Sequence, residues 1–422
     1  MRSISTFRYL SISLTIFLGY LGSVNAQQRM TLSVAAFPAV DEIVKAILPQ
    51  WNASHPDVAI KVVSRQFNDH HTAMITALST SSYLPDVMAL EQGYVGRLSQ
   101  GGGLTDLSQA PFNGKQYAAQ FVPYAVAQGT SRSGALMAIP TDIGPGTLLY
   151  RADLLEKAGV TEADLTRSWD SYIDAGIKIK QVTGAYLMAN AQDMKNILIR
   201  SNIQLGDGLY YNSQFKAIVN SPRFERAFVL AKKVRDLKLD AKTQAWSPEW
   251  AEGFKRGTQA TQMSGAWLAG HLSNWIAPNN KGLWRAAQLP EKTWVAYGGT
   301  FYAIPRTVTE DRKQLAWQLI QMLTLNRTAQ LTAFKAQDAF PSLMATYDDP
   351  FFDAPMPFLG EQRARQLWRE ASRHITAIQV HKQDAFADEV INTELDKVLD
   401  QGKPIKAALA DAQRLIDYRA NR

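Results

Sequence analysis

Residues 135–160 read ALMAIPTDIGPGTLLYRADLLEKAGV, and the architecture of the whole chain can be inferred from them. They open with a short apolar run, Ala135–Ile139, that is typical of a strand. Two prolines and two glycines follow between positions 140 and 146, which predicts a break in any helix or central strand. A second strand-like run, Thr147–Tyr150, comes next, and then a segment with helical spacing that reaches Gly159.

The irregular part of this segment carries two polar side chains, Thr141 and Asp142. A strand that leads through a polar, irregular segment into a new strand and helix is expected where a chain leaves one lobe, lines a cleft and enters a second lobe. From these residues alone, an ordinary strand–loop–strand connection is the alternative.

The N-terminal part of the chain alternates strands with helices. Strands are predicted at Met30–Ala35, Val58–Val63 and Val87–Leu90, and helices at Val40–Trp51 and Thr72–Thr80. Strand–helix–strand units of this length favour parallel pairing and predict an α/β layer. Residues 185–188 are strand-like, and further helices are predicted at Tyr94–Ser99, Ser168–Gln181, Asp193–Ile203, Pro222–Lys238, Glu361–Arg373, Asp384–Leu399 and Pro404–Ala420.

The first residues have the pattern of a secretory signal. Arg2 and Arg8 form a basic start, Leu10–Leu21 is apolar, and small residues precede a cleavage point predicted after Ala26. The apolar run is shorter than the roughly 20 residues that span a bilayer. Because the chain has no cysteine, we expect no disulfide and no lipid anchor. We therefore predict a periplasmic protein that is secreted across the inner membrane.

Composition limits the function classes. The 422 residues are 46% hydrophobic and 20% charged, which suits two or three globular domains. Without Arg2 and Arg8 the formal net charge falls from +7 to +5, and the basic residues are spread among acids. This pattern does not favour nucleic-acid binding, whereas it leaves an anionic ligand open.

The usual catalytic and metal motifs are missing. The sequence has no thiol, no Gly-x-Ser-x-Gly, no Gly-x-x-x-x-Gly-Lys and no His-Glu-x-x-His pattern. His70 and His71 are adjacent, so on a regular element they are expected to point apart, which disfavours a metal site. Carboxylates are numerous, and a glycosidase pair is therefore an alternative that the sequence leaves open. No carboxylate pair stands out by its spacing, and the sequence indicates no cofactor and no metal site.

Residues 135–160 resemble the first interlobe crossing of the family 1 extracellular solute-binding proteins, the sugar-capturing subunits of ABC importers. Other segments resemble the same family in order and spacing. They are HPDVAIKVVS (55–64), PDVMALEQGYVGRLSQGGGLTDLS (85–108), FKRGTQATQMSGAWLAGHLSNW (254–275), GLWRAAQLPE (282–291), YGGTFYAIPR (297–306), AWQLIQMLT (316–324) and FPSLMATYDDP (340–350).

The resemblance implies the two-lobe periplasmic binding protein fold, an α/β architecture with discontinuous lobes, hinge crossings and a ligand cleft between them. Residues 27–142 and 300–327 are expected to form lobe 1, and residues 143–299 and 328–422 a mostly helical lobe 2. The implied function is capture of a mono- or oligosaccharide by interlobe closure and delivery to permease subunits in the inner membrane. Because the family is non-catalytic, the resemblance also implies that the protein is not an enzyme. We expect a monomer.

The resemblance also indicates where a sugar would bind. Trp267 matches the position where the family places a stacking tryptophan, and core packing is the alternative. Glu91 follows the strand Val87–Leu90, where the family commonly has an acid that binds sugar hydroxyls; a surface or capping role is the alternative. Gly298 and Gly299 match a glycine pair beside the sugar, and a tight turn is the alternative.

Other candidates carry acidic or aromatic side chains. Asp41 and Glu42 lie where the family often uses an acid, although helix N-terminal charge explains them equally well. Thr300 occupies the place where some relatives carry a second stacking aromatic. The residues that could replace that aromatic are Trp294, Tyr297, Phe301 and Tyr302.

The remaining candidates are polar residues at strand ends and in loops. Asp142 lies in the crossing, where it contacts ligand or forms a hinge-stabilising hydrogen bond. Gln66 and Asn68 are predicted to close the second strand, at the edge where ligands bind in open α/β sheets. Asn190 follows a strand-like segment, and Arg373 lies near the matching C-terminal loop, where solvent exposure is the alternative.

Two kinds of alternative function stay open at this point. Within the same fold, the ligand would be a polyol, a uronate or a glycerophosphodiester. In a different class, the protein would be an exported carbohydrate-active enzyme. Presentation of the ligand to a chemosensor is a third role, and it is compatible with transport.

Overall fold

The computed structural model describes residues 29–420 of the chain, so the predicted signal segment lies outside the described residues. The strands are β1 (Met30–Ala36), β2 (Val58–Ser64), β3 (Val87–Glu91), β4 (Ile139–Arg151), β5 (Thr261–Gly265), β6 (Trp284–Ala287) and β7 (Ala296–Ala303). The α-helices are α1 (Val40–Ser54), α2 (Phe67–Thr80), α3 (Gln92–Gln100), α4 (Pro123–Gly129), α5 (Ala152–Ala158), α6 (Glu162–Thr166), α7 (Trp169–Thr183), α8 (Ala191–Leu198), α9 (Pro222–Asp236), α10 (Pro248–Arg256), α11 (Trp267–His271), α12 (Glu310–Leu325), α13 (Arg327–Gln337), α14 (Ala364–His374), α15 (Asp384–Gln401) and α16 (Ile405–Ala420). Within residues 29–420 we find no helix whose length and hydrophobicity together would suit a bilayer-spanning segment.

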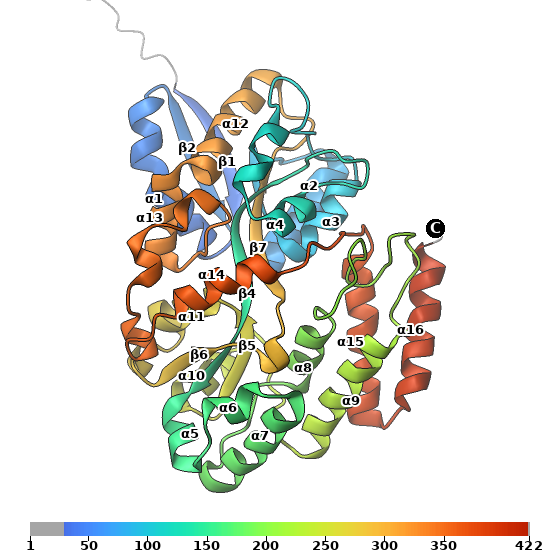
Figure 1. Cartoon of the computed structure of the whole chain (residues 1–422). Helices are drawn as coiled ribbons and strands as arrows, with labels where there is room; N and C mark the ends of the chain where they lie inside the picture. Colours follow the sequence, from blue (N-terminus) through green and yellow to red (C-terminus); the bar gives the residue numbers. More distant parts are fainter. Residues whose placement is uncertain (1–28, 421–422) are drawn as a thin grey trace, which may run out of the picture.

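The strands form one mixed sheet in the order β2-β1-β3-β7-β4-β5, with β6 paired to β4 beside this path. β1 is parallel to β2 and β3, as the strand–helix–strand pattern predicts, whereas β7 is antiparallel to β3 and β4. Figure 1 shows two lobes. The upper lobe contains β1–β3 with α1–α4 and α12, and the lower lobe contains β5 and β6 with α5–α11, α15 and α16. The predicted two-lobe α/β fold is confirmed.

β4 is one continuous strand of 13 residues, so the predicted break at positions 140–146 is wrong. Its first half pairs with β7 and its second half with β5 and β6, which carries the chain from the upper to the lower lobe. The pairing with β7 shifts register between Pro140 and Asp142 and again between Ile143 and Pro145. These irregularities let the prolines, which lack an N–H, stay within a strand.

Two glycines allow the backbones of β4 and β7 to come close together. A Cβ atom on Gly144 would lie 2.0 Å from the carbonyl oxygen of Tyr297, and one on Gly146 would lie 2.4 Å from Cγ2 of Val295. Any larger residue at these positions would force the two strands apart. Gly144 and Gly146, from which a break was predicted, therefore allow the close pairing of β4 with β7.

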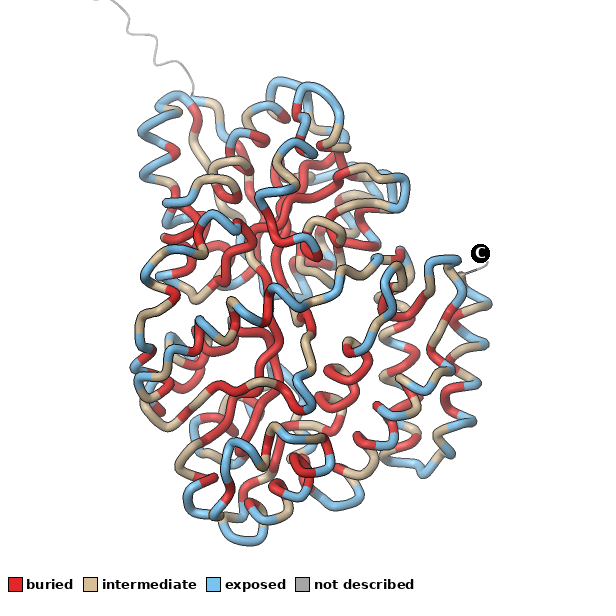
Figure 2. The backbone as a smooth tube through the Cα atoms, in the orientation of Figure 1, coloured by how far each residue is buried: buried red, intermediate tan, exposed pale blue. Residues whose placement is uncertain are grey.

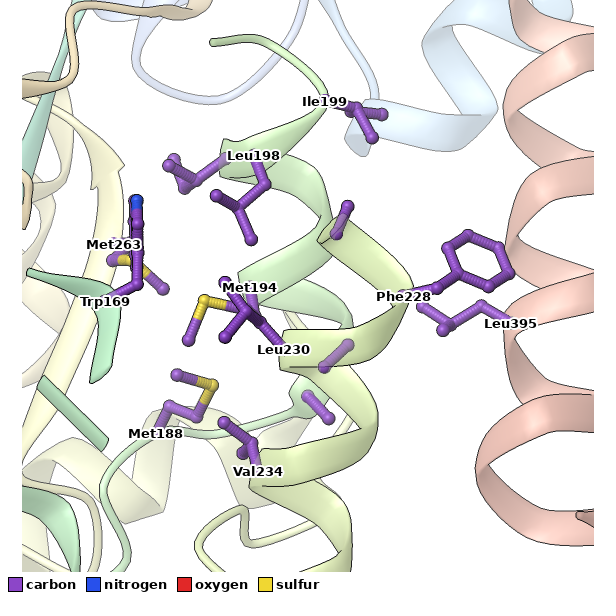
Figure 3. Close-up of a cluster of buried hydrophobic side chains, with 14 of the residues drawn as sticks. Trp169, Met188, Met194, Leu198, Ile199, Phe228, Leu230, Val234, Met263 and Leu395 are labelled. Atoms are coloured by element: carbon purple, nitrogen blue, oxygen red, sulfur yellow. The ribbon is translucent and has the colours of Figure 1, made fainter. Parts of the chain in front are cut away.

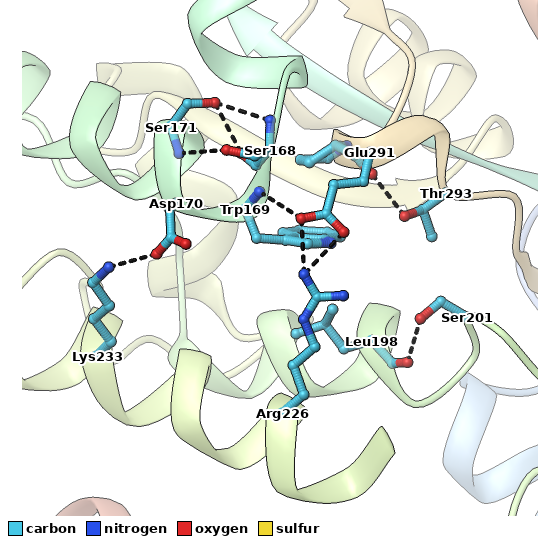
Figure 4. A network of polar contacts seen from close by, with 11 residues as sticks. Ser168, Trp169, Asp170, Ser171, Leu198, Ser201, Arg226, Lys233, Glu291 and Thr293 are labelled. Carbon is cyan, nitrogen blue, oxygen red and sulfur yellow. Dashed lines mark hydrogen bonds and ion pairs between the residues drawn. The ribbon is translucent and has the colours of Figure 1, made fainter. Parts of the chain in front are cut away.

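Local signals set the helix ends in the lower lobe. Ser168 begins α7 as predicted: its Oγ accepts from the Ser171 N–H at 3.0 Å, and the Ser171 Oγ accepts from the Ser168 N–H at 3.0 Å. Figure 4 shows this cap and, beside it, the Glu291 carboxylate, which binds Arg226 on α9 at 2.8 Å. α5 ends at Gly159, whose φ of 62° is the left-handed conformation that glycine favours.

Each lobe has its own apolar core. Figure 2 shows that burial follows the central strands and the inner faces of the helices. In the lower lobe, Met188, Met194 and Met263 pack with Trp169 among the helices, and all four are at most 2% exposed (Figure 3). Another cluster spans the join between the lobes and includes residues from α4, α10, α11, α13 and α14.

The predicted lobe boundaries at 142/143, 299/300 and 327/328 stay predictions. α13 begins at the third of these boundaries and has contacts in two places: Ala333 packs against Ile43 of α1 in the upper lobe, and Phe334 belongs to the cluster at the join. The Gln330 Nε2 also donates to the Oγ1 of Thr141 on β4 at 3.0 Å. This helix is therefore anchored to the crossing strand.

Further differences from the sequence-based expectation include those at α2, α8 and residues 185–188. α2 begins at Phe67 and not at Thr72. The start was missed because Phe67 is followed by four polar residues, Asn68 to His71, which break the apolar periodicity. α8 begins two residues before the predicted start and ends at Leu198, because the Asn190 Oδ1 caps it by accepting from the Gln192 N–H. Residues 185–188 form only isolated bridges, to Gln259 and Asp240.

We predict that Gly144→Ala destabilises the protein by roughly 1–3 kcal/mol, because the added methyl group collides with backbone of β7. Urea unfolding of both proteins measures the difference. Gly101→Ala is the matched control, since its Cβ atom would lie 3.4 Å from the Arg97 carbonyl oxygen. Equal free energies of unfolding for Gly144→Ala and the natural protein would contradict the close approach of β4 and β7.

Candidate functional site

Several predicted site residues meet where β3, β4, β7 and α11 come together at the join between the lobes. We call this group the junction site. It consists of Glu91, Asp142, Arg200, Trp267, Tyr297, Gly298 and Gly299.

Trp267 is fixed at the junction site by its own indole N–H, which donates to the Tyr297 carbonyl oxygen at 2.8 Å. A Cβ atom on Gly298 would lie 2.9 Å from the indole nitrogen, and one on Gly265 would lie 2.3 Å from it. The two glycines therefore make room for the indole, and Gly298 uses a left-handed φ of 83°. Trp267 is half-buried, so it keeps part of its surface accessible.

The two carboxylate oxygens of Glu91 point to different partners. Its Oε2 accepts from the Gly93 N–H at 2.7 Å and caps α3, which confirms the capping alternative for that oxygen. The other oxygen, Oε1, lies 3.7 Å from the position that a Cβ atom of Gly298 would occupy. An acceptor is thus directed at the glycine beside the Trp267 indole.

Two histidines of α2 hold the end of β3 in place. The His70 Nε2 donates to the Ala89 carbonyl oxygen at 2.7 Å, and the Glu91 N–H donates to the His71 Nε2 at 3.0 Å. Both histidines are buried and their ring centroids are 4.9 Å apart, so the expectation that they point apart is wrong. Burial lowers the pKa of His71 to about 3, which keeps its Nε2 an acceptor. Across residues 29–420, no three His, Asp or Glu side chains are grouped to hold a metal ion.

The electrostatics of the junction site are set by two carboxyl groups and one guanidinium group. Burial raises the pKa of Glu91 to about 7; the Gly93 N–H and Arg200 oppose this rise and Asp142 adds to it. Burial also raises the pKa of Asp142 to about 6, against hydrogen bonds from Thr300. The Asp142 Oδ1 is buried and has no hydrogen-bond partner among the residues that the structure describes.

Two residues of the junction site were not among the main candidates. Arg200 was missed by the sequence analysis, and Tyr297 was only one of four possible stacking residues. The Arg200 Cζ lies 5.0 Å from the centroid of the Tyr297 ring, and its Nη1 donates to the Asn196 carbonyl oxygen at 2.7 Å. Arg200 follows α8 and approaches Glu91 only through folding, so no local pattern signals it. Tyr297 directly precedes the glycine pair, which was the available signal for it.

Of the four aromatic residues that could replace the second stacking aromatic, only two have an accessible ring in the structure. Tyr302 and Phe301 are 0% and 1% exposed in the upper-lobe core, so neither ring can stack on a ligand there. The prediction for Tyr302 is wrong because its place on β7 points it inward, toward the core. Tyr297 and Trp294 are half-buried, and Trp294 stacks on His374 with centroids 4.9 Å apart.

Four predicted residues lie at the starts of upper-lobe helices. Asp41 and Glu42 are in the first turn of α1, and each binds Lys45, at 3.2 and 2.6 Å. Gln66 and Asn68 do not close β2, which ends at Ser64; Gln66 precedes α2 and Asn68 lies in its first turn. Both are exposed side chains. Helix N-terminal positions account for all four, and ligand contact by them stays a prediction.

Asn190 and Arg373 have other partners in the structure. The Asn190 side chain caps α8, and its Nδ2 also lies 3.4 Å from the Thr243 carbonyl oxygen. Arg373 is in the last turn of α14, exposed, with its Nη1 3.3 Å from Glu370. Arg373 therefore matches the solvent-exposed alternative.

A cavity of about 920 Å³ opens in the upper lobe, away from the junction site. It lies between the end of α3 and the start of α12, and its lining includes Ser99, Arg306 and Lys313. None of the residues of the junction site lines it.

Comparison with known proteins identifies the family. Residues 46–356 match the bacterial extracellular solute-binding proteins, and this match covers most of the chain. The chain belongs to this family. The resemblance drawn from residues 135–160 is thereby confirmed.

Relatives and solved structures agree with the assignment. The chain is 27% identical to the lactose-binding protein of Rhizobium radiobacter over 59% of its own length and 58% of that protein. It is 23% identical to the arabinooligosaccharide-binding protein of Bacillus subtilis (strain 168) over 62% and 61%. These alignments therefore span about three fifths of each relative. The fold is similar, at a TM-score of 0.79 and 22% identity over 93% of this chain and 97% of the other, to the ABC transporter associated binding protein from B. animalis subsp. lactis Bl-04, solved with beta-1,6-galactobiose.

The raised pKa of Glu91 predicts a pH-dependent stability that Glu91→Gln removes. Between its ordinary value of 4.5 and about 7, the folded protein binds the Glu91 proton more tightly than the unfolded chain does. Stability must therefore fall as pH rises through this window, because the partly buried carboxyl group of Glu91 loses its proton. We expect the Tm of the natural protein to fall relative to that of Glu91→Gln between pH 5 and pH 8.

Thermal unfolding of both proteins across this pH range measures the effect. The side-chain amide oxygen of the Glu91→Gln variant would still accept from the Gly93 N–H, so the cap is retained. Glu42→Gln, which removes an exposed carboxylate bound to Lys45, controls for the loss of one charge. Parallel curves of Tm against pH for the natural protein and Glu91→Gln would show that Glu91 is not desolvated.

Proposed function

We propose that this protein is the periplasmic substrate-binding component of an ABC-type carbohydrate importer, which binds a mono- or oligosaccharide between its lobes and delivers it to a membrane permease. One observation carries the proposal. Glu91 at the end of β3 in the upper lobe and Trp267 on α11 in the lower lobe meet at Gly298. A hydrogen-bond acceptor from one lobe thus lies beside an indole from the other.

This pair has the chemistry that a sugar requires. An indole covers the apolar C–H face of a sugar ring, and a carboxylate or guanidinium group binds the ring hydroxyls. Trp267 would supply the stacking surface, and Glu91, Asp142 and Arg200 would supply the hydrogen-bonding groups. The buried Asp142 Oδ1, which has no partner within residues 29–420, supports a role as an acceptor.

The relatives support a sugar as the ligand class. The lactose-binding protein and the arabinooligosaccharide-binding protein, to which this chain is similar, are sugar-binding proteins. Within the junction site, two carboxyl groups face one guanidinium group. This balance favours a neutral sugar or polyol over a uronate or a glycerophosphodiester, because an anion would meet like charges.

Closure would follow from the arrangement of these groups. A sugar that touches both Glu91 and Trp267 makes all of its contacts only when the lobes are closed, so it binds that form more tightly and shifts the population toward it. The closed protein would then dock on the permease subunits, while a separate subunit hydrolyses ATP. We propose a monomer that is exported to the periplasm without a lipid anchor and that is not an enzyme.

A thermal-shift experiment tests the proposal. The chain from residue 27 onward is refolded to remove bound ligand and is then heated with lactose, arabinobiose, beta-1,6-galactobiose, sorbitol, galacturonate or glycerophosphocholine. A ligand at about 100 times its Kd adds about 2.7 kcal/mol of stability, which raises the Tm of a protein of this size by several degrees.

We expect at least one neutral sugar to raise the Tm, and Trp267→Ala to abolish that shift while its ligand-free circular dichroism spectrum stays unchanged. A response only to galacturonate or glycerophosphocholine would keep the fold and refute the sugar. Conversion of a responding sugar to products on chromatography would refute the binding role in favour of a carbohydrate-active enzyme.

A further inference from the structure

Residues 375–383, which join α14 to α15, run between the two lobes. Figure 1 shows this segment below α3 of the upper lobe and above α8 of the lower lobe. Ile375 and Ile378 line a cavity of only about 30 Å³, and Arg200 of the junction site lines it too. A cavity of this size holds about one water molecule, so the segment lies close against the junction site. We call residues 375–383 the strap.

A glycine of each lobe lies against the backbone of the strap. A Cβ atom on Gly96 of α3 would lie 2.9 Å from the Cβ atom of Val380 and 3.1 Å from the His381 carbonyl oxygen. A Cβ atom on Gly208, in the lower-lobe loop between α8 and α9, would lie 2.4 Å from the Gln379 carbonyl oxygen. Neither glycine has a positive φ, and glycine is unfavourable inside a helix such as α3. The close approach of the strap therefore accounts for both glycines.

Several contacts attach the strap to the lower lobe. The Gln379 N–H donates to the Asp207 carbonyl oxygen at 3.2 Å, and the His381 N–H donates to the Asp384 carboxylate at 2.7 Å at the start of α15. The His381 ring also packs on that of Tyr211, with centroids 3.9 Å apart. Because backbone and side chain are both bound on this side, the strap is expected to move with the lower lobe.

The contacts across to the upper lobe are fewer. The Gln100 Nε2 donates to the Val380 carbonyl oxygen at 2.9 Å. The Arg132 Cζ lies 3.4 Å from the ring centroid of Phe215, which is in the same lower-lobe loop as Gly208. Open space lies beside these contacts, since Gln100 lines both the cavity of about 920 Å³ and a second cavity of about 400 Å³ next to α15. A small interface of this kind permits relative motion of the two lobes.

We propose that the strap is a latch, which stays with the lower lobe and holds it against α3 even when no sugar is bound. Opening of the lobes breaks the Gln100–Val380 hydrogen bond and the Arg132–Phe215 contact, and it leaves the lower-lobe contacts of the strap intact. The latch favours the closed form with or without ligand, so part of the ligand-free protein is closed. This inference goes beyond the proposed function, because it depends on no particular ligand.

A distance measurement in the ligand-free protein tests the inference. The chain has no cysteine, so Ser133→Cys and Gln214→Cys provide the sole attachment points for two spin labels. Both side chains are exposed, and they flank the Arg132–Phe215 contact, so the distance between the labels increases when the lobes separate. Double electron–electron resonance on the chain from residue 27 onward, refolded to remove bound ligand, measures the populations with short and long distances.

We expect the labelled natural protein to show a short distance that represents the closed form. Gln100→Ala should raise the ratio of open to closed protein roughly two- to tenfold, because one neutral hydrogen bond between the lobes is lost. Gly96→Ala should raise the same ratio, since its methyl group displaces the strap from α3. Gly101→Ala is the matched control at the end of the same helix: its Cβ atom would contact no residue of the strap, so the ratio should not change.

Two results would overturn the latch. One is a single long distance in the ligand-free natural protein, and the other is a ratio that both Gln100→Ala and Gly96→Ala leave unchanged. Circular dichroism establishes that each variant is folded, and Gln100→Ala, which alters only a partly buried side chain, decides the matter if Gly96→Ala does not fold. If no sugar binds the natural protein but the ratio responds as expected, the proposed function fails and the latch stands.

Discussion

The pairing of β4 with β7 brings two backbones so close at Gly144 that no side chain fits between them. The same pairing places Asp142 opposite Thr300 and Ile143 opposite Gly299. Because the Tyr297 carbonyl oxygen on β7 accepts the Trp267 indole N–H, the position of the indole depends on this pairing too. This strand contact therefore positions the candidate site at the join between the lobes.

The proposed site also depends on the carboxyl group of Glu91, which is held in place before any ligand arrives. Glu91 is fixed through its backbone by His71 and through one oxygen by Gly93, so its remaining oxygen has little freedom. Burial opposes its ionisation, which raises its pKa to about 7. Holding a desolvated acceptor costs stability in the ligand-free protein, and hydroxyl donors of a sugar would offset that cost on binding.

The sequence predicted the features that depend on local pattern. The α/β alternation, the helix that starts at Ser168, the helix end at Gly159 and the crossing at residues 135–160 are confirmed. The break within β4 was predicted wrongly, because a bulged strand tolerates prolines that a regular strand does not. Arg200 was missed because only folding brings it near Glu91, and the inward direction of Tyr302 depended on the register of β7.

The division of contacts between the lobes gives the two parts of the proposed site different roles. Glu91 comes from the upper lobe and Trp267 from the lower lobe, so a sugar that touches both binds the closed form more tightly. Trp267 lies on the lower lobe alone, so stacking on it is equally available to a sugar whether the lobes are open or closed. Equal affinity for two states shifts no population, however large it is. In the proposed mechanism, therefore, stacking on Trp267 holds the sugar on the lower lobe, and the added hydrogen bond to Glu91 determines how far the sugar shifts the protein toward closure.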